Sequence, residues 1–161
     1  MSKSNEQKNE TAELLQLVSF KIGQEEFGVD ILNVHEINKM VAITKVPNAP
    51  HFVEGVINLR GRVIPIIDLR TRLKLEKKEH DKDTRIIVVE INKKTVGFIV
   101  DAVKEVLRIP VTITEAPPEI VAGIDSEFIK AVGKLEDRLL ILMDLEKVLT
   151  VNDQKLLSEV A

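Results

Sequence analysis

The sequence VINLRGRVIPIIDL occupies residues 56–69 and predicts two short apolar strands, a turn between them and the start of a helix. Gly61 can adopt the positive φ that a tight turn requires. Asp68 is placed to cap the helix, because its carboxylate can accept a hydrogen bond from a backbone N–H of the first turn. Short strands joined by tight turns, with only brief helices, indicate an all-β barrel or sandwich.

The same pattern recurs in the second half of the chain. Residues 132–145, VGKLEDRLLILMDL, align with residues 56–69 without a gap, and Asp144 takes the place of Asp68. Shorter matches lie upstream in the same order: 29–37 with 100–106, and 43–47 with 113–117. A single β domain whose strands merely share a composition would also give isolated matches. Their common order favours a tandem duplication.

Alternating apolar residues predict the other strands of the two copies. The first copy spans about 14–80, with strands over 17–22, 27–29, 34–39, 55–59 and 63–67. Asp30 is expected to cap one helical turn that ends at Asn33. The second copy spans about 84–151 and begins with strands over 85–91 and 95–100. A barrel of this size has a thin core, so the copies are expected to pack together and to exchange a strand.

The segments outside the copies are read from their composition. Residues 1–13 lack the apolar stretch of a secretory signal and are expected to form a flexible tail. Residues 74–83, rich in charge, form a solvated connector. Residues 152–161 are expected to form a short helix or tail, with Leu156, Leu157 and Val160 at helical spacing.

The composition argues against several classes of protein. The chain has no cysteine, which excludes disulfides and thiolate metal sites, and five Phe but no Trp or Tyr, so its core is aliphatic. The net charge is −3 and the sequence has no basic stripe, so we do not expect the protein to bind nucleic acid. No apolar run reaches the ~20 residues of a membrane span, so no membrane insertion is expected.

No motif predicts catalysis. The histidines, His35, His51 and His80, lie far apart without the spacing of metal ligands, so no metal site is expected. The chain lacks a GxSxG elbow and the glycine-rich phosphate loops GxGxxG and GxxxxGK[ST]. We therefore expect a protein that is not an enzyme and holds no cofactor. A small-ligand-binding β-barrel of unknown chemistry stays as the alternative.

Arg60 is the polar residue that stands out in the apolar unit. Its counterpart in the second copy is Glu136, so the fold itself does not require arginine at this turn. One explanation is an ion pair with a carboxylate such as Glu36 in the same copy. The other is an anchor for a partner, since arginine is common in interfaces. The two explanations are compatible.

Residues 55–70, GVINLRGRVIPIIDLR, resemble the signature of the CheW family, in which NLRG precedes a strand with proline and a DL helix start. The similarity covers about residues 14–150. It implies two tandem five-stranded SH3-like barrels with partly exchanged strands. It also implies a non-catalytic adaptor that couples chemoreceptors to the histidine kinase CheA. Such a protein would be cytoplasmic, recruited to receptor arrays at the inner face of the membrane, and a monomer when isolated.

The resemblance also assigns candidate residues, position by position. A groove between the barrels would receive the receptor's hairpin tip, with contacts from Ile31, Val34, Val96 and Gly97. The regulatory domain of CheA would bind one barrel end, formed by Ile37, Ile43, Val46 and Pro47. Positions linked to coupling match Glu36, Gly55 and Arg60. No residue is assigned to catalysis or to a metal.

Overall fold

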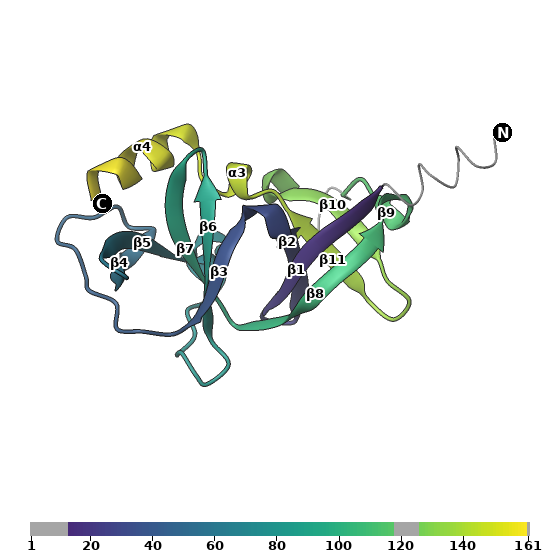
Figure 1. Ribbon diagram of the computed structural model, residues 1–161, viewed down its shortest axis with the longest axis horizontal. Coiled ribbons are helices and arrows are strands. Elements are labelled where there is room, and N and C mark those ends of the chain that lie inside the picture. Colours follow the sequence, from purple (N-terminus) through teal and green to yellow (C-terminus); the bar gives the residue numbers. More distant parts are fainter. Residues whose placement is uncertain (1–12, 118–125, 161) are drawn as a thin grey trace.

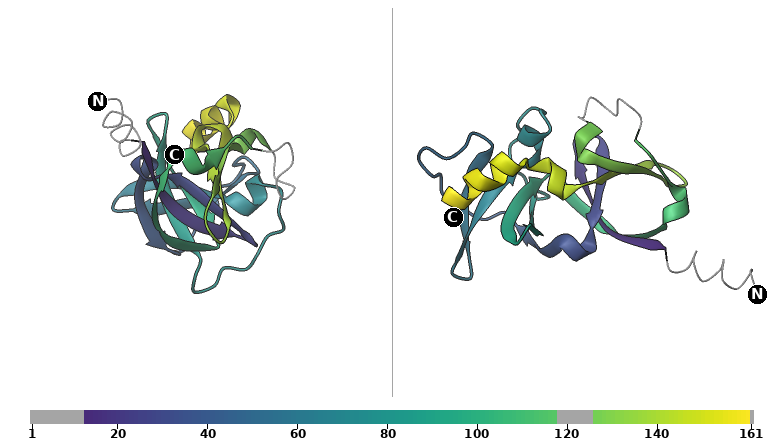
Figure 2. Two further views of the ribbon diagram at one scale, coloured as in Figure 1. Left: turned by 90° about the vertical axis from the view of Figure 1, so that its right-hand side faces the viewer. Right: turned by 90° about the horizontal axis from the view of Figure 1, so that it is seen from above.

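The computed structural model describes residues 13–117 and 126–160, which form two lobes side by side (Figures 1 and 2). We call the lobes barrel one and barrel two. Barrel one is a five-stranded sheet in the order β3 (Val34–Lys39), β6 (Arg85–Ile91), β7 (Lys94–Val100), β5 (Arg62–Asp68), β4 (Val53–Leu59). Barrel two is a six-stranded sheet in the order β8 (Ala102–Pro110), β1 (Leu14–Ile22), β2 (Glu25–Asp30), β11 (Leu139–Met143), β10 (Ile129–Lys134), β9 (Thr114–Glu115).

The two copies exchange their first hairpins. Hairpin β1–β2 belongs to the first copy but pairs with strands of the second, β8 and β11. Hairpin β6–β7 opens the second copy but pairs with β3 and β5 of the first. The expected exchange of strands is therefore present, and it is reciprocal. The boundaries of about 14–80 and 84–151 stay a prediction for the repeat, since each sheet draws on both copies.

The aligned segments 56–69 and 132–145 form equivalent structures. Each contains an antiparallel hairpin, β4–β5 in barrel one and β10–β11 in barrel two. The second strand of each hairpin also pairs in parallel with the exchanged hairpin, Ile66 opposite Gly97 and Leu142 opposite Gly28. Two hairpins that make the same pairings in separate sheets are the structural counterpart of the sequence repeat.

Short helices follow the strands. They are η1 (Ile31–Asn33), α2 (Leu69–Arg72), η2 (Val111–Ile113), η3 (Ser126–Phe128), α3 (Leu145–Val148) and α4 (Val151–Val160). Asp30, Asp68 and Asp144 cap η1, α2 and α3 as the sequence predicts, each carboxylate accepting from the backbone N–H two residues later. Within the described residues, no helix is long and apolar enough to cross a membrane. The expected tail, residues 1–13, lies outside the described residues except for Glu13.

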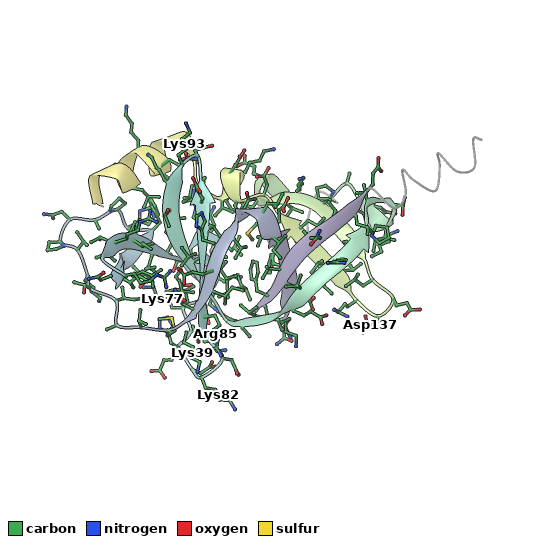
Figure 3. All side chains as sticks on the ribbon, in the orientation of Figure 1. Lys39, Lys77, Lys82, Arg85, Lys93 and Asp137 are labelled. Atoms are coloured by element: carbon green, nitrogen blue, oxygen red, sulfur yellow. The ribbon has the colours of Figure 1, made fainter. Side chains whose placement is uncertain are left out.

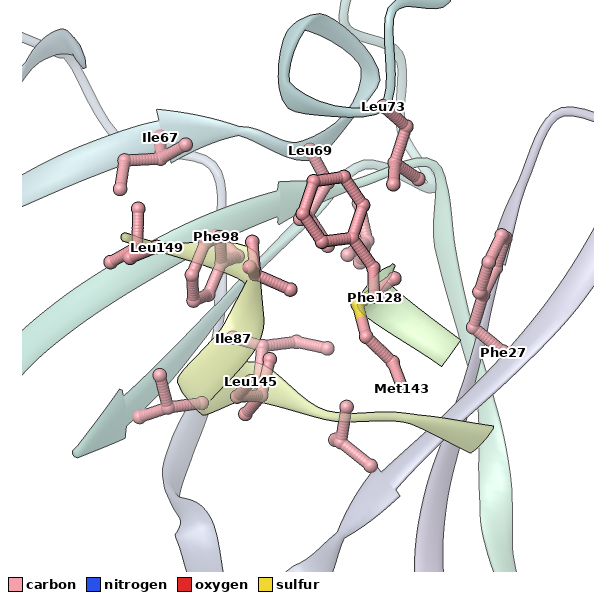
Figure 4. Packing of buried hydrophobic residues seen from close by; sticks show 14 of the residues in the cluster. Phe27, Ile67, Leu69, Leu73, Ile87, Phe98, Phe128, Met143, Leu145 and Leu149 are labelled. Carbon is pink, nitrogen blue, oxygen red and sulfur yellow. The ribbon is translucent and has the colours of Figure 1, made fainter. Parts of the chain in front are cut away.

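The core has three parts because several strands of each sheet are buried on both faces. A large central cluster joins the barrels and includes Phe27 of barrel two and Phe98 of barrel one (Figure 4). Smaller clusters lie on the opposite faces, around Ile66 and Ile86 in barrel one and around Leu140 in barrel two. Burial on both faces explains why strands such as β5 and β6 are continuous apolar runs instead of strict alternations.

An ion pair ties the two barrels together. Arg70 on α2 makes a bidentate contact with Asp101, donating from Nε at 2.8 Å and from Nη2 at 2.5 Å, while Gly23 in the β1–β2 turn donates its N–H to Asp101 at 2.8 Å. Burial raises the pKa of the Asp101 carboxyl, but these hydrogen bonds outweigh burial and hold the pKa below its ordinary value. Asp101 stands where the chain passes from barrel one to barrel two, so the pair fixes their relative position.

Candidate functional site

Strand β3 supplies the centre of the predicted site. Among the described strands it is an edge strand of barrel one, paired with β6 alone, and its side chains alternate between half-buried and exposed positions. Val34 and Glu36 are half-buried, whereas the side chain of Ile37 is 40% exposed. An edge strand with an apolar residue on its open face is a common place for a partner to bind.

The expected ion pair between Glu36 and Arg60 is present. Arg60 and Gly61 form the two-residue turn between β4 and β5, with φ of 52° and 84°. Positive φ at both positions gives the turn the twist that a tight hairpin needs, and Gly61 donates its N–H to the side chain of Asn58 at 2.9 Å. The turn thereby directs the Arg60 guanidinium onto β3. Since the Arg60 side chain is still 72% exposed, it can also contact a partner.

A polar hollow surrounds this ion pair. Its volume is about 270 Å³, and its lining includes Arg60, Arg62, Glu36 and His35. Arg62 donates to the hydroxyl of Thr95 at 3.0 Å, and His35 lies 2.9 Å from Glu90. Charged and polar side chains at an interface give specificity for a complementary partner, so the hollow is suited to polar recognition.

Gly55 positions the segment that follows β3. Thr44 and Val56 exchange two backbone hydrogen bonds, of 2.9 and 2.8 Å, which lay this segment across β4. A Cβ at Gly55 would meet the carbonyl oxygen of Thr44 and would lie 2.7 Å from Cγ2 of Ile43. Only glycine leaves room for the crossing. Gly55 therefore acts on Ile43 through the backbone and is itself buried.

The kinase-binding candidates lie on β3 and on this segment, and they differ in exposure. Ile37 and Pro47 are exposed, whereas Ile43 and Val46 are half-buried. Ile43 packs on the small cluster of barrel one and anchors the segment. Val41, which is 47% exposed on the same segment, was not among the predicted residues. Its position in VAIT, next to two other apolar residues, gave no sign of which one faces solvent.

Three of the receptor-binding candidates, Ile31, Val34 and Val96, lie at the central cluster, whereas Gly97 faces the smaller cluster of barrel one. Val34 is paired with Val89, and Val89 with Val96, so the three form a row across β3, β6 and β7. Ile31 and Val34 are half-buried at the edge of the central cluster. Val96 is only 1% exposed, and the space beside Gly97 is filled by Ile66 and Ile86. Ile31 and Val34 are thus open to contact in this state, whereas Val96 and Gly97 lie beneath the surface.

Leu32 is the exposed residue that the sequence argument overlooked here. It follows Ile31 in η1, where the Asp30 carboxylate accepts its N–H at 2.9 Å, and its side chain is 88% exposed. Among the large apolar residues described as exposed, none is more open to solvent. The sequence did contain a signal for this exposure. Ile31 and Leu32 are adjacent apolar residues in a single capped turn, and such a turn can bury only one of them.

Comparisons with known proteins identify relatives over most of the chain. Residues 16–153 match a family model described as CheW-like domain. The chain is 38% identical over 142 residues to the Chemotaxis protein CheW of Klebsiella aerogenes, covering 88% of this chain and 86% of that protein. It is 39% identical over 146 residues to the Chemotaxis protein CheW of Helicobacter pylori, covering 91% and 87%.

A solved structure supports the same relationship. The scaffolding protein TtCheW from Thermoanaerobacter tengcongensis superposes with a TM-score of 0.78 at 43% sequence identity, covering 86% of this chain and 90% of that one. These matches agree with the two β-rich lobes described above. None of them favours the alternative of a small-ligand-binding barrel.

Proposed function

We propose that this chain, which belongs to the CheW family of chemotaxis proteins, is a non-catalytic adaptor that couples chemoreceptors to the histidine kinase CheA. The observation that supports this proposal is the presence of two separate exposed apolar surfaces on barrel one. One lies at η1, around Leu32, and the other lies on β3 and the following segment, around Val41. An adaptor needs two such surfaces, because it must hold two partners at once.

The surface around Leu32 is proposed to bind the hairpin tip of the receptor. Ile31 and Val34 flank Leu32, and both reach the central cluster between the barrels. An amphipathic helix docks by placing apolar side chains into such a wall. Val96 and Gly97 are proposed to shape the wall from beneath, since their own atoms are buried here.

The surface around Val41 is proposed to bind the regulatory domain of CheA. Ile37 and Pro47 extend it, and Ile43 and Val46 hold the segment in place. The ion pair of Glu36 and Arg60 lies beside it and would join this surface to the polar hollow. We further propose that the chain is a monomer when isolated and joins receptor arrays at the inner face of the membrane through these two contacts.

Reconstitution tests the proposal. Adding this chain to purified CheA and a receptor fragment should bring kinase activity under receptor control, and leaving it out should abolish that control.

Leu32→Glu should weaken receptor binding, and Val41→Glu should weaken binding of the CheA regulatory domain. Each effect should be about 2 kcal/mol, or roughly thirtyfold, because a charge is placed at the centre of an apolar contact.

Leu139→Glu provides the matched control. Leu139 is 61% exposed and lies on β11 of barrel two, away from both proposed surfaces. Its variant should bind both partners as the parent does. If the parent chain binds neither partner by isothermal titration calorimetry, the proposed function is wrong. If Leu32→Glu and Val41→Glu weaken the same partner, the assignment of the two surfaces is wrong.

A further inference from the structure

Helix α4 follows the second copy in the sequence but lies on barrel one. Figures 1 and 2 show it above β6 and β7. The side chain of Asn92, in the turn between these strands, donates to Oε1 of Gln154 at 2.9 Å, and the ammonium group of Lys94 donates to the Gln154 carbonyl at 2.6 Å. Leu157 is 4% exposed and enters the central cluster. The helix therefore covers an apolar face of barrel one.

One carboxylate holds the first turn of α4 in place. Asp153 accepts the N–H of Thr150 at 3.0 Å, and the Thr150 hydroxyl accepts the N–H of Asp153 at 3.0 Å, which is a reciprocal cap. The same carboxylate forms an ion pair with Arg72 of α2 at 2.6 Å. A helix of ten residues is marginal by itself. Its docked state therefore depends on Asp153 and on Leu157.

The face beneath α4 is not completely filled. A hollow of about 280 Å³ lies beside Leu157, with an apolar floor formed by Val63, Pro65 and Val96. Val63 is 54% exposed. Arg62 and Lys94 line the same hollow and are the charged residues among its described lining. Lys93 follows Asn92 in the turn beside α4 and adds a third positive charge (Figure 3).

We propose that α4 is a releasable strap that competes with a helix of the receptor tip for this face of barrel one. The inference rests on the proposed function, because it names the receptor as the competitor. Three observations carry it: the face already accepts a helix, the hollow leaves room for a further apolar side chain, and the side chains of Arg62 and Lys94 suit a helix with acidic flanks. Val96, one of the receptor candidates, lies on the floor of the hollow.

The strap would tune the affinity for the receptor. A binding site that is open only part of the time binds with an affinity reduced by that fraction. Release of α4 would uncover Val96 and would remove Leu157 from the central cluster. It would also break the hydrogen bond from the Lys94 ammonium group to the Gln154 carbonyl. This explains why a residue expected to contact the receptor is buried in the present state.

A locked strap tests the proposal. The chain has no cysteine, so Asn92→Cys combined with Gln154→Cys supplies the only two thiols. Joining them with a short bis-maleimide should hold α4 on barrel one. The locked protein should bind a soluble receptor hairpin fragment at least tenfold more weakly than the same double variant before joining. Its affinity for the CheA regulatory domain should be unchanged.

Release of the strap should have the opposite effect. Asp153→Ala removes half of the cap and the partner of Arg72, and we expect receptor binding to tighten about five- to tenfold. Thr150→Ala, which removes the other half of the cap, should give a smaller change in the same direction. Glu146→Ala is the matched control, because it removes an equal charge from the exposed face of α3. Its receptor affinity should equal that of the parent.

The outcomes separate this inference from the proposed function. Equal receptor affinity of the locked and unjoined forms would overturn the strap and leave the coupling function intact. If no form binds the receptor fragment, the parent included, the proposed function itself fails. If locking alters only self-association, measured by analytical ultracentrifugation, the face serves a second copy of this chain and the receptor is not the competitor.

Discussion

Arg60 combines a constrained backbone with an exposed side chain. Its φ of 52° is uncommon for a residue with a Cβ and costs about 1 kcal/mol. The ion pair with Glu36 contributes little in return, because an exposed pair contributes at most ~1 kcal/mol. The second copy has Glu136 at this position. Stability alone therefore gives a weak reason for arginine here, and a role in binding gives a stronger one.

Substitution of Arg60 separates these two roles. We expect Arg60→Ala to shift the free energy of unfolding by less than ~1 kcal/mol, because the side chain is mostly exposed. We also expect it to impair receptor control of the kinase in the reconstituted assay. Urea unfolding and kinase activity measure the two effects. A variant that unfolds would instead assign Arg60 to the fold. The exchanged pair Glu36→Arg with Arg60→Glu keeps the ion pair, so it would recover control only if the pair itself matters.

At the scale of elements, the segment after β3 depends on Gly55. The segment crosses β4 so closely that an added Cβ at Gly55 would meet the backbone of Thr44. The Thr44–Val56 bridge then sets where Val41 and Pro47 stand. The position of the proposed kinase-binding surface thus depends on a residue that is itself buried.

A glycine pair tests this dependence. Gly55→Ala should lower the free energy of unfolding by about 1–3 kcal/mol, because the crossing segment must move away. It should also weaken binding of the CheA regulatory domain. Gly61→Ala is the control, since no atom lies within 4 Å of its added Cβ, although its φ of 84° is strained. Gly61→Ala should cost about 1 kcal/mol and leave the kinase affinity closer to that of the parent. Equal loss of kinase affinity in both variants would contradict the positioning role.

At the scale of the whole molecule, the exchanged hairpins make each barrel incomplete without the other copy. Barrel two needs β1 and β2, and barrel one needs β6 and β7. The central cluster and the contact between Arg70 and Asp101 join the barrels further. Separating the copies would therefore remove the strand partners of both exchanged hairpins.

The chain should therefore unfold in one step. We expect a single transition in calorimetry, with coincident loss of the signals from both barrels by NMR during urea unfolding. Fragments 13–80 and 84–161 should each lack a dispersed NMR spectrum. Two resolved transitions, or a folded isolated fragment, would show that the exchange is not needed for stability.

The local features of this protein could be predicted from residues that are close together in the chain. Short apolar runs, Gly61 in its turn, the capping residues Asp30 and Asp144, and the repeated hairpin unit all depend on residues close together in the chain. The NLRG segment also pointed to the family that the comparisons confirm. Local hydrogen bonds and side-chain periodicity leave a readable trace in sequence, so these predictions needed no tertiary information.

Which elements pack against each other could not be predicted from local sequence. Hairpins β1–β2 and β6–β7 have similar apolar patterns, so nothing local states which sheet each one joins. The burial of Val96 and the exposure of Leu32 likewise depend on what packs above them, and α4 reaches barrel one from the far end of the chain. The hydrophobic effect does not depend on which residues are neighbours in the sequence. It depends on the neighbours that the complete fold supplies.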